Sequence, residues 1–303
     1  MRYVITAAAV VLIAAQPLPG AWTSGPPMPA ACSEVAVATA GNTIYVIGGY
    51  ANGGVDQSLA LAFHPIVQNG RITGSWRSVA PLPRGLNHIA AVGYHGKIYT
   101  FGGFAAQNDA AVADANVYDP VTDRWSALPS LPHPLGSISA AVLGDEIHLV
   151  GGRDAHSVAT HVVYDPGVKR YSVRAPLPVG RDHMGLIAYD GRLYAVGGRI
   201  DTPAHNTSYV DIYNPATDAW RSGAPMPAPR SGMAAAYTTN ERYNPAGNVW
   251  SEYAPLPEGR HGTGAAVIER RLYVAGGAPV PGGSRQSNTL LVFQVDRYRM
   301  PLL

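Results

Sequence analysis

The chain has 303 residues, of which only 14% are charged, and its formal net charge is +2 at pH 7. A nucleic-acid partner would require a strongly basic face, so this near-neutral balance argues against one. The single cysteine, Cys32, excludes an internal disulfide.

The first element in chain order is an N-terminal leader. One arginine, Arg2, precedes the apolar run 3–15, and Gln16 and Pro17 follow it. This run is too short to cross a membrane comfortably and is typical of a secretory signal peptide, with an uncleaved anchor as the alternative. We expect residues 1–21 to be a signal peptide and residues 22–303 to form one domain. The protein is then secreted or periplasmic, without a membrane contact after cleavage.

From residue 44 onward, the sequence repeats a hydrophobic strand that ends in Gly-Gly. The five copies are residues 44–49, 98–103, 147–152, 193–198 and 272–277. Most copies are followed by a variable stretch, a Tyr-Asp-Pro-like turn, a Trp and a Pro-x-Pro. Self-similarity with a period of about 50 residues indicates a repeat architecture.

The second unit shows the repeat most clearly, over residues 89–132. Short alternating apolar runs lie between Gly, Asp and Pro turns, which predicts four antiparallel strands. A large aromatic residue recurs once in each unit, and it suits the gap between neighbouring twisted sheets. These aromatic positions are Trp22, Trp76, Trp125, Tyr171, Trp220 and Trp250. The Gly-Gly pair allows another stretch of backbone to pass close to the end of the second strand.

With these elements, the chain resembles the kelch-repeat β-propellers over essentially its whole mature length. The resemblance rests on four repeated sequence elements, which are Gly-Gly, Tyr-(Asp/Asn)-Pro, Trp and Pro-x-Pro-x-x-Arg. It implies a ring of blades around a central channel, with the binding site on the loops of one face. The length, leader and unit count are also similar, more distantly, to the exported sialic acid mutarotases (N-acetylneuraminate epimerases) of this fold. Kelch propellers include both enzymes and protein-binding modules, so the fold alone does not decide the function.

Six aromatic positions predict an all-β, six-bladed propeller. The chain begins with a fourth-strand signature at Trp22 and ends after a third-strand signature at residues 290–295. We therefore expect the N-terminal strand to complete the last blade and close the ring. The fifth unit is short, because Tyr237 and Tyr243 bracket a segment that runs from Tyr189 to Tyr213 in the fourth unit. We expect a truncated fifth blade that lacks about one strand, either as a thin sheet or as a distorted region.

The loops that lead from one unit into the next carry a repeated arginine. Arg181, Arg230 and Arg260 each lie three residues after the last Pro of a Pro-x-Pro, while Arg153 and Arg199 directly follow a Gly-Gly. A crescent of arginines predicts a receiver for a carboxylate, because the planar guanidinium offers paired donors. The alternative is that these arginines brace neighbouring loops, since an arginine after Pro-x-Pro belongs to the kelch pattern itself.

The same loops place Glu34, His88 and His183 five residues after the aligned Pro. These are the candidate catalytic residues if the protein is an enzyme, because ring opening of a sugar acid needs an acid and a base beside the arginines. The set of His88, His183 and His261 lacks any paired local spacing, so we expect no metal. No cofactor motif occurs, and we expect no cofactor.

We therefore predict a non-enzymatic, secreted recognition propeller that acts as a monomer. Its expected ligand is a protein, an acidic peptide or an acidic glycan bound on the arginine-lined loops. A periplasmic sugar mutarotase of the sialic acid type is the alternative function. A third possibility is a poorly folded relic, because the fifth unit is incomplete.

Overall fold

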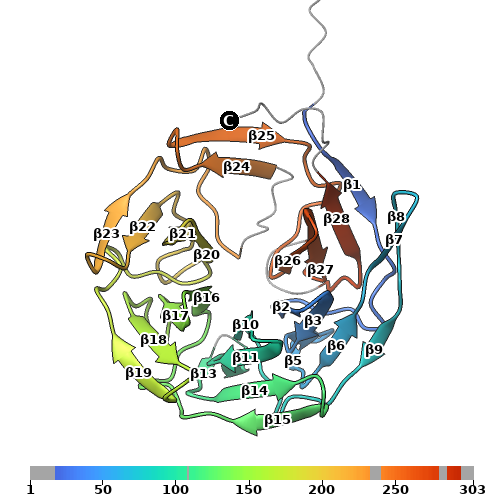
Figure 1. The fold of residues 1–303 in the computed structure, drawn as a ribbon, viewed down its shortest axis with the longest axis horizontal. Helices are drawn as coiled ribbons and strands as arrows, with labels where there is room; N and C mark the ends of the chain where they lie inside the picture. Colours follow the sequence, from blue (N-terminus) through green and yellow to red (C-terminus); the bar gives the residue numbers. More distant parts are fainter. Residues whose placement is uncertain (1–17, 108, 233–239, 280–284, 295–303) are drawn as a thin grey trace, which may run out of the picture.

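The computed structural model describes residues 18–107, 109–232, 240–279 and 285–294, and every regular element in them is a β-strand. The strands form a ring of small sheets around a central axis (Figure 1). No helix in this part of the chain is long and apolar enough to cross a membrane. The predicted signal peptide falls mainly on residues 1–17, outside the described residues.

Four blades follow one another along the chain, each with four antiparallel strands in chain order from the axis outward. The innermost strands surround the axis in Figure 1. The first blade contains β2 (Ala36–Ala40), β3 (Thr43–Ile47), β6 (Ala60–Phe63) and β9 (Trp76–Ser78), and the second contains β10 (Ala90–Tyr94), β11 (Lys97–Phe101), β14 (Ala115–Asp119) and β15 (Arg124–Ala127). The third contains β16 (Ser139–Leu143), β17 (Glu146–Val150), β18 (His161–Asp165) and β19 (Arg170–Val173), and the fourth contains β20 (Gly185–Tyr189), β21 (Arg192–Val196), β22 (Val210–Asn214) and β23 (Ala219–Ser222).

Three short hairpins extend the loops of the first two blades. They are β4 (Tyr50–Ala51) with β5 (Val55–Asp56), β7 (Ile66–Gln68) with β8 (Arg71–Thr73), and β12 (Phe104–Ala106) with β13 (Asp109–Ala111). The first and third of these hairpins lie between the second and third strands of their blades. They therefore enlarge the loops between the second and third strands of these two blades.

The last complete blade is closed by the N-terminus, as the sequence predicts. It consists of β26 (Gly264–Ile268), β27 (Arg271–Ala275), β28 (Leu290–Gln294) and β1 (Ala21–Ser24). Strand β1 pairs antiparallel with β28, which sets Trp22 opposite Phe293. The two rings lie 4.9 Å apart between centroids, so aromatic packing supports the closing ladder.

The prediction of six blades is wrong, because the described residues contain five complete blades. Among the described residues, the remaining place in the ring, between β23 and β26, holds the two-stranded sheet of β24 (Asn240–Asn244) and β25 (Val249–Tyr253) (Figure 1). The expected loss of about one strand from this unit stays a prediction. The predicted first strand of this unit falls on residues 233–239, outside the described residues.

The aromatic positions explain why the sequence count reaches six. Each of the six side chains donates a hydrogen bond to a backbone carbonyl of the neighbouring sheet, for example from Trp125 Nε1 to Ala80 O at 2.7 Å. Trp250 of β25 does the same to Ala224 O at 3.0 Å. The incomplete unit therefore retains its outer strand, β25, and the hydrogen bond from this strand to the neighbouring unit.

The Gly-Gly pairs allow the close approach that the sequence predicts. Gly151 has a φ of 66°, and a Cβ atom placed on it would lie 2.4 Å from the carbonyl oxygen of Arg181. Any other residue would collide with the loop that enters the next blade. The Gly-Gly pairs thus fix the position of the loops that carry the candidate site.

Candidate functional site

Six residues at equivalent loop positions encircle the axis, and five of them lie two residues before the first strand of a sheet. They are Glu34, His88, Ser137, His183, Gly232 and Gly262, and all have a φ between 50° and 66°. Four backbone hydrogen bonds join successive members, such as His88 N to Glu34 O at 3.2 Å and Ser137 N to His88 O at 3.0 Å. Non-glycine residues adopt this left-handed conformation uncommonly, and here four of them do so at one repeat position. We call these six residues the axial ring.

Glu34 is the anionic centre of the axial ring. One carboxylate oxygen lies 3.0 Å from His88 Nε2, and the other lies 3.0 Å from His261 Nε2. Burial raises the pKa of the Glu34 carboxyl, but the charges and hydrogen bonds of the two imidazoles outweigh it and hold the pKa well below its ordinary value. Glu34 is therefore a buried carboxylate that carries its charge at neutral pH.

His88 is held between Glu34 and an amide. The Asn87 side chain donates its N–H groups to Asp56 Oδ1 at 2.7 Å and to Phe104 O at 3.0 Å. Its Oδ1 atom is left to accept a hydrogen bond from His88 Nδ1, at 2.5 Å. His88 is thus fixed from both sides, by the Asn87 amide at Nδ1 and by the Glu34 carboxylate at Nε2.

His183 is held between an aspartate and an arginine. Its Nδ1 donates to Asp182 Oδ1, and Arg199 Nη2 donates to its Nε2 at 3.1 Å. Arg199 Nε also holds Asp182 at 3.1 Å, and Ser157 Oγ holds the other Asp182 oxygen. Burial lowers the pKa of His183 to about 4, with help from the nearby positive groups and against the Asp182 carboxylate. His183 is thus a neutral imidazole at pH 7, with its Nε2 lone pair toward the axis.

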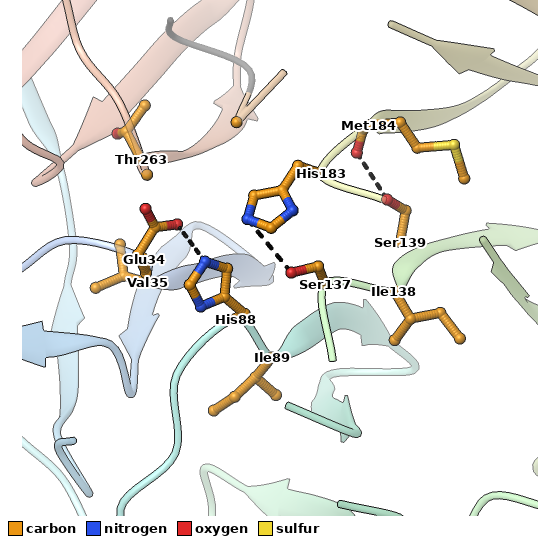
Figure 2. A pocket seen from close by; sticks show the side chains of 12 residues that line it. Glu34, Val35, His88, Ile89, Ser137, Ile138, Ser139, His183, Met184 and Thr263 are labelled. Atoms are coloured by element: carbon orange, nitrogen blue, oxygen red, sulfur yellow. Dashed lines mark hydrogen bonds and ion pairs between the residues drawn. The ribbon is translucent and has the colours of Figure 1, made fainter. Parts of the chain in front are cut away.

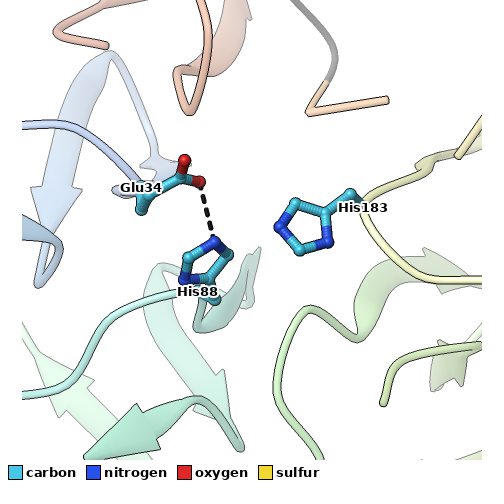
Figure 3. A group of neighbouring side chains, drawn as sticks. All are labelled: Glu34, His88 and His183. Carbon is cyan, nitrogen blue, oxygen red and sulfur yellow. Dashed lines mark ion pairs between the residues drawn. The ribbon is translucent and has the colours of Figure 1, made fainter. Parts of the chain in front are cut away.

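These side chains line a cavity of about 140 Å³ at the axis. In Figure 2, Glu34, His88, Ser137 and His183 point toward one another into this space. The donor atoms of Glu34, His88 and His183 all lie within 4.8 Å of one another (Figure 3). The three candidate catalytic residues of the sequence are therefore brought together. His261, which directly precedes Gly262, also joins them, because its Nε2 atom lies 3.0 Å from Glu34 Oε1.

The five predicted ligand-binding arginines do not form an open crescent. Arg181 is fully buried and pairs with Asp211 at 2.7 Å, while Arg230 forms two bonds to Glu241 at 2.6 and 2.8 Å. The other two ion pairs join Arg260 to Glu258 at 2.9 Å and Arg199 to Asp182 at 3.1 Å. A guanidinium removed from water requires such partners, so these four arginines brace the loops.

Arg153 differs from the other four arginines. Within the described residues it has no carboxylate partner, and its Nη1 donates to the carbonyl oxygen of Asp201 at 3.3 Å. Its backbone pairs with Gly136, the residue that precedes Ser137 of the axial ring. Arg153 is therefore the arginine of this set that the described residues leave without an ion pair within 4 Å.

Two residues that the sequence motifs did not reveal orient the imidazoles of His88 and His183. Asn87 and Asp182 each precede a histidine of the axial ring and bind its Nδ1 atom. The repetition of Asn-His and Asp-His at the same loop position was a usable signal. It gains meaning once the loops are seen to converge on one axis.

A ring of four-stranded sheets around a polar axial cavity defines a β-propeller. The family model described as "Kelch motif" matches residues 31–83, 86–132 and 180–227, and the chain belongs to the kelch-repeat propellers. "Kelch-like protein terF" from Aspergillus terreus is 35% identical over 244 residues, which cover 73% of this chain and 52% of that protein. "Kelch-like protein 25" from Xenopus tropicalis is 29% identical over 208 residues, covering 68% of this chain and 35% of that protein.

Among solved structures, the one titled "Structure of YjhT" matches with a TM-score of 0.75. It covers 92% of this chain and 99% of that chain at 14% identity, a likeness that shows the fold alone. The match to the curated relatives spans about half of their length or less. The activity and partners of those whole proteins therefore do not transfer directly to this chain.

Proposed function

We propose that the chain is a recognition propeller that binds a partner protein through the loops around the axial cavity. The size of this cavity carries the proposal. Sites for small molecules and cofactors usually measure about 300–1,000 Å³, whereas the axial cavity measures about 140 Å³. A space of this size suits one inserted side chain of a partner, while the surrounding loops contact the rest of its surface. The similarity to kelch-like proteins supports the same class of function.

The proposed inserted group is a carboxylate, as in an acidic peptide or a glycan acid. Arg153 supports this choice, because its guanidinium lacks a carboxylate partner in the described part of the chain. The backbone of Arg153 pairs with Gly136, so Arg153 belongs to a loop next to the one that carries Ser137 of the axial ring. A charge-assisted bond to an arginine in a partly dry site is stronger than one in water. The leader pattern further supports our proposal that this binding takes place outside the cytoplasm.

The test is a peptide-array screen of the purified mature chain, followed by calorimetric titration of the best peptide and of its Asp→Asn or Glu→Gln counterpart. We expect the selected peptides to share an acidic residue, and Arg153→Ala to weaken binding about tenfold or more. Arg84→Ala is the matched control, because Arg84 forms an exposed pair with Asp114. Peptides without a common acidic residue, or equal losses in the two variants, would contradict the proposal.

A sugar mutarotase remains the second candidate, and the presence of two imidazoles and a carboxylate in one cavity favours it. His183 offers a neutral imidazole that can take a proton, and His88 Nε2 lies 3.0 Å from the Glu34 carboxylate in the same cavity. Ring opening of a sugar acid requires an acid and a base. The test is the exchange rate between anomers of N-acetylneuraminate, followed by NMR. His183→Ala and Glu34→Gln should each slow the exchange, and a rate equal to that of buffer alone would exclude this activity.

A further inference from the structure

We infer that Glu34, His88 and His183 form a binding site for one divalent transition-metal ion on the propeller axis. Their donor atoms are one carboxylate oxygen and two imidazole nitrogens, all within 4.8 Å of one another (Figure 3). This ligand set suits Zn²⁺, Fe²⁺, Co²⁺ and Ni²⁺ and leaves coordination positions open. A metal here is compatible with the proposed recognition function, because its open positions could bind a carboxylate of the partner, whereas it would occupy the His183 lone pair that the mutarotase candidate uses as a base.

Two of the three donors already stand at the spacing of metal ligands. Ligand atoms that lie about 2.1 Å from one ion are separated from each other by roughly 3.0–3.4 Å. Glu34 Oε2 and His88 Nε2 are 3.0 Å apart. His183 must move inward on the order of 1 Å to complete the site. His261 holds the second oxygen of Glu34 at 3.0 Å, which favours binding of the metal by the first oxygen alone.

The second observation is the way in which both histidines are oriented. Each one uses Nδ1 to bond a side-chain oxygen of the residue before it, Asn87 for His88 and Asp182 for His183. Each therefore directs Nε2 toward the axis. Metal-ligating histidines almost always show this outer hydrogen bond, which fixes the ring and its tautomer. The arrangement arises independently in two loops, so it is a feature of the site.

Arg199 is the group that competes with the metal. Its Nη2 atom donates a hydrogen bond to the His183 Nε2 lone pair at 3.1 Å, while its Nε atom donates to Asp182 Oδ1 at 3.1 Å. A metal ion must displace the first bond, and the guanidinium charge opposes a cation nearby. Removing this charge should therefore strengthen metal binding, which is the reverse of what a supporting residue would do. A substitution of Arg199 therefore tests the inference, because it should increase the affinity for the metal.

The experiment uses the mature chain, stripped with EDTA and then titrated with Co²⁺ by absorption spectroscopy and with Zn²⁺ by calorimetry. We expect one ion per chain, with visible Co²⁺ bands from a nitrogen–oxygen site. Glu34→Gln and His183→Ala should each weaken binding by more than about 100-fold, since even outer hydrogen-bond partners are worth about 10- to 100-fold. His156→Ala, at a histidine whose side chain is 80% exposed, is the control that should bind as the parent does.

Arg199→Gln should bind Zn²⁺ several-fold more tightly than the parent chain does. Thermal melts of the metal-free variants verify that each one is folded. The number of ions bound per parent chain is measured without any substitution, so it does not depend on the folding of a variant. The inference is overturned if the parent shows no saturable binding of either ion. It is also overturned if Glu34→Gln and His183→Ala bind as the parent does, because the ion then occupies adventitious surface histidines.

Discussion

Replacing Arg181 with alanine should destabilise the ring strongly, because this arginine is fully buried. Its Nη1 atom pairs with Asp211 at 2.7 Å, and its Nε and Nη2 atoms donate to the carbonyl oxygens of Gly197 and Ala195 at 2.8 and 3.2 Å. Asp211 is itself only 4% exposed. The substitution leaves a buried carboxylate without its partner and two strand-end carbonyls without donors. Breaking such a pair costs about 3–5 kcal/mol.

The assay is denaturant unfolding followed by tryptophan fluorescence, together with a thermal melt. For a chain of this size, we expect a melting temperature lower by roughly 5–10 °C. Arg84→Ala is the control, because the Arg84–Asp114 pair is exposed and such pairs contribute about 0–1 kcal/mol. The double variant Arg181→Ala with Asp211→Ala should recover part of the loss, because it removes the unpaired charge. A loss below about 1 kcal/mol in Arg181→Ala, with ligand binding abolished, would refute bracing and restore Arg181 as a ligand receiver.

Two further predictions concern the pH dependence of stability and the effect of glycine substitutions on stability. Burial lowers the pKa of His148 to about 3, so below pH 6.5 the unfolded chain binds a proton that the fold does not. Stability should fall as the pH drops from about 6.5 toward 3, by up to about 1.4 kcal/mol per pH unit, and His148→Gln should flatten this slope in melts at several pH values. Gly151→Ala should destabilise more than Gly144→Ala in denaturant titrations. Both have a positive φ, but a Cβ atom at Gly144 meets nothing within 4 Å. Equal losses would show that the clash does not matter.

The repeat architecture could be predicted from the sequence because its determinants are local. Gly-Gly, the turn residues and the aromatic side chain each act within one unit, and the position of Trp22 indicated ring closure. The number of complete blades could not be obtained in this way. Trp250 retains its bond to the neighbouring sheet, so counting aromatic positions also counts a unit with only two described strands.

The arginines show a different limit. A guanidinium after Pro-x-Pro looks the same in sequence whether it receives a ligand or braces a loop. The carboxylates that decide the matter, Asp211 for Arg181 and Glu241 for Arg230, belong to later strands. Only the folded ring brings them within bonding distance. The candidate site was predicted better, because Glu34, His88 and His183 share one repeat position, and a closed ring places equivalent positions around one axis.

The distribution of residues around the axial ring gives the site its polarity. Four members carry polar side chains, whereas the two on either side of the incomplete unit are glycines, Gly232 and Gly262. Glycine is required at position 262, because a Cβ atom there would lie 2.4 Å from the Glu34 carboxylate. A side chain would push Glu34 away from His88 and His261, and the buried charge would lose the two imidazoles that stabilise it. The absence of a side chain at position 262 thus allows the axial ring to hold the Glu34 carboxylate between its two imidazole partners.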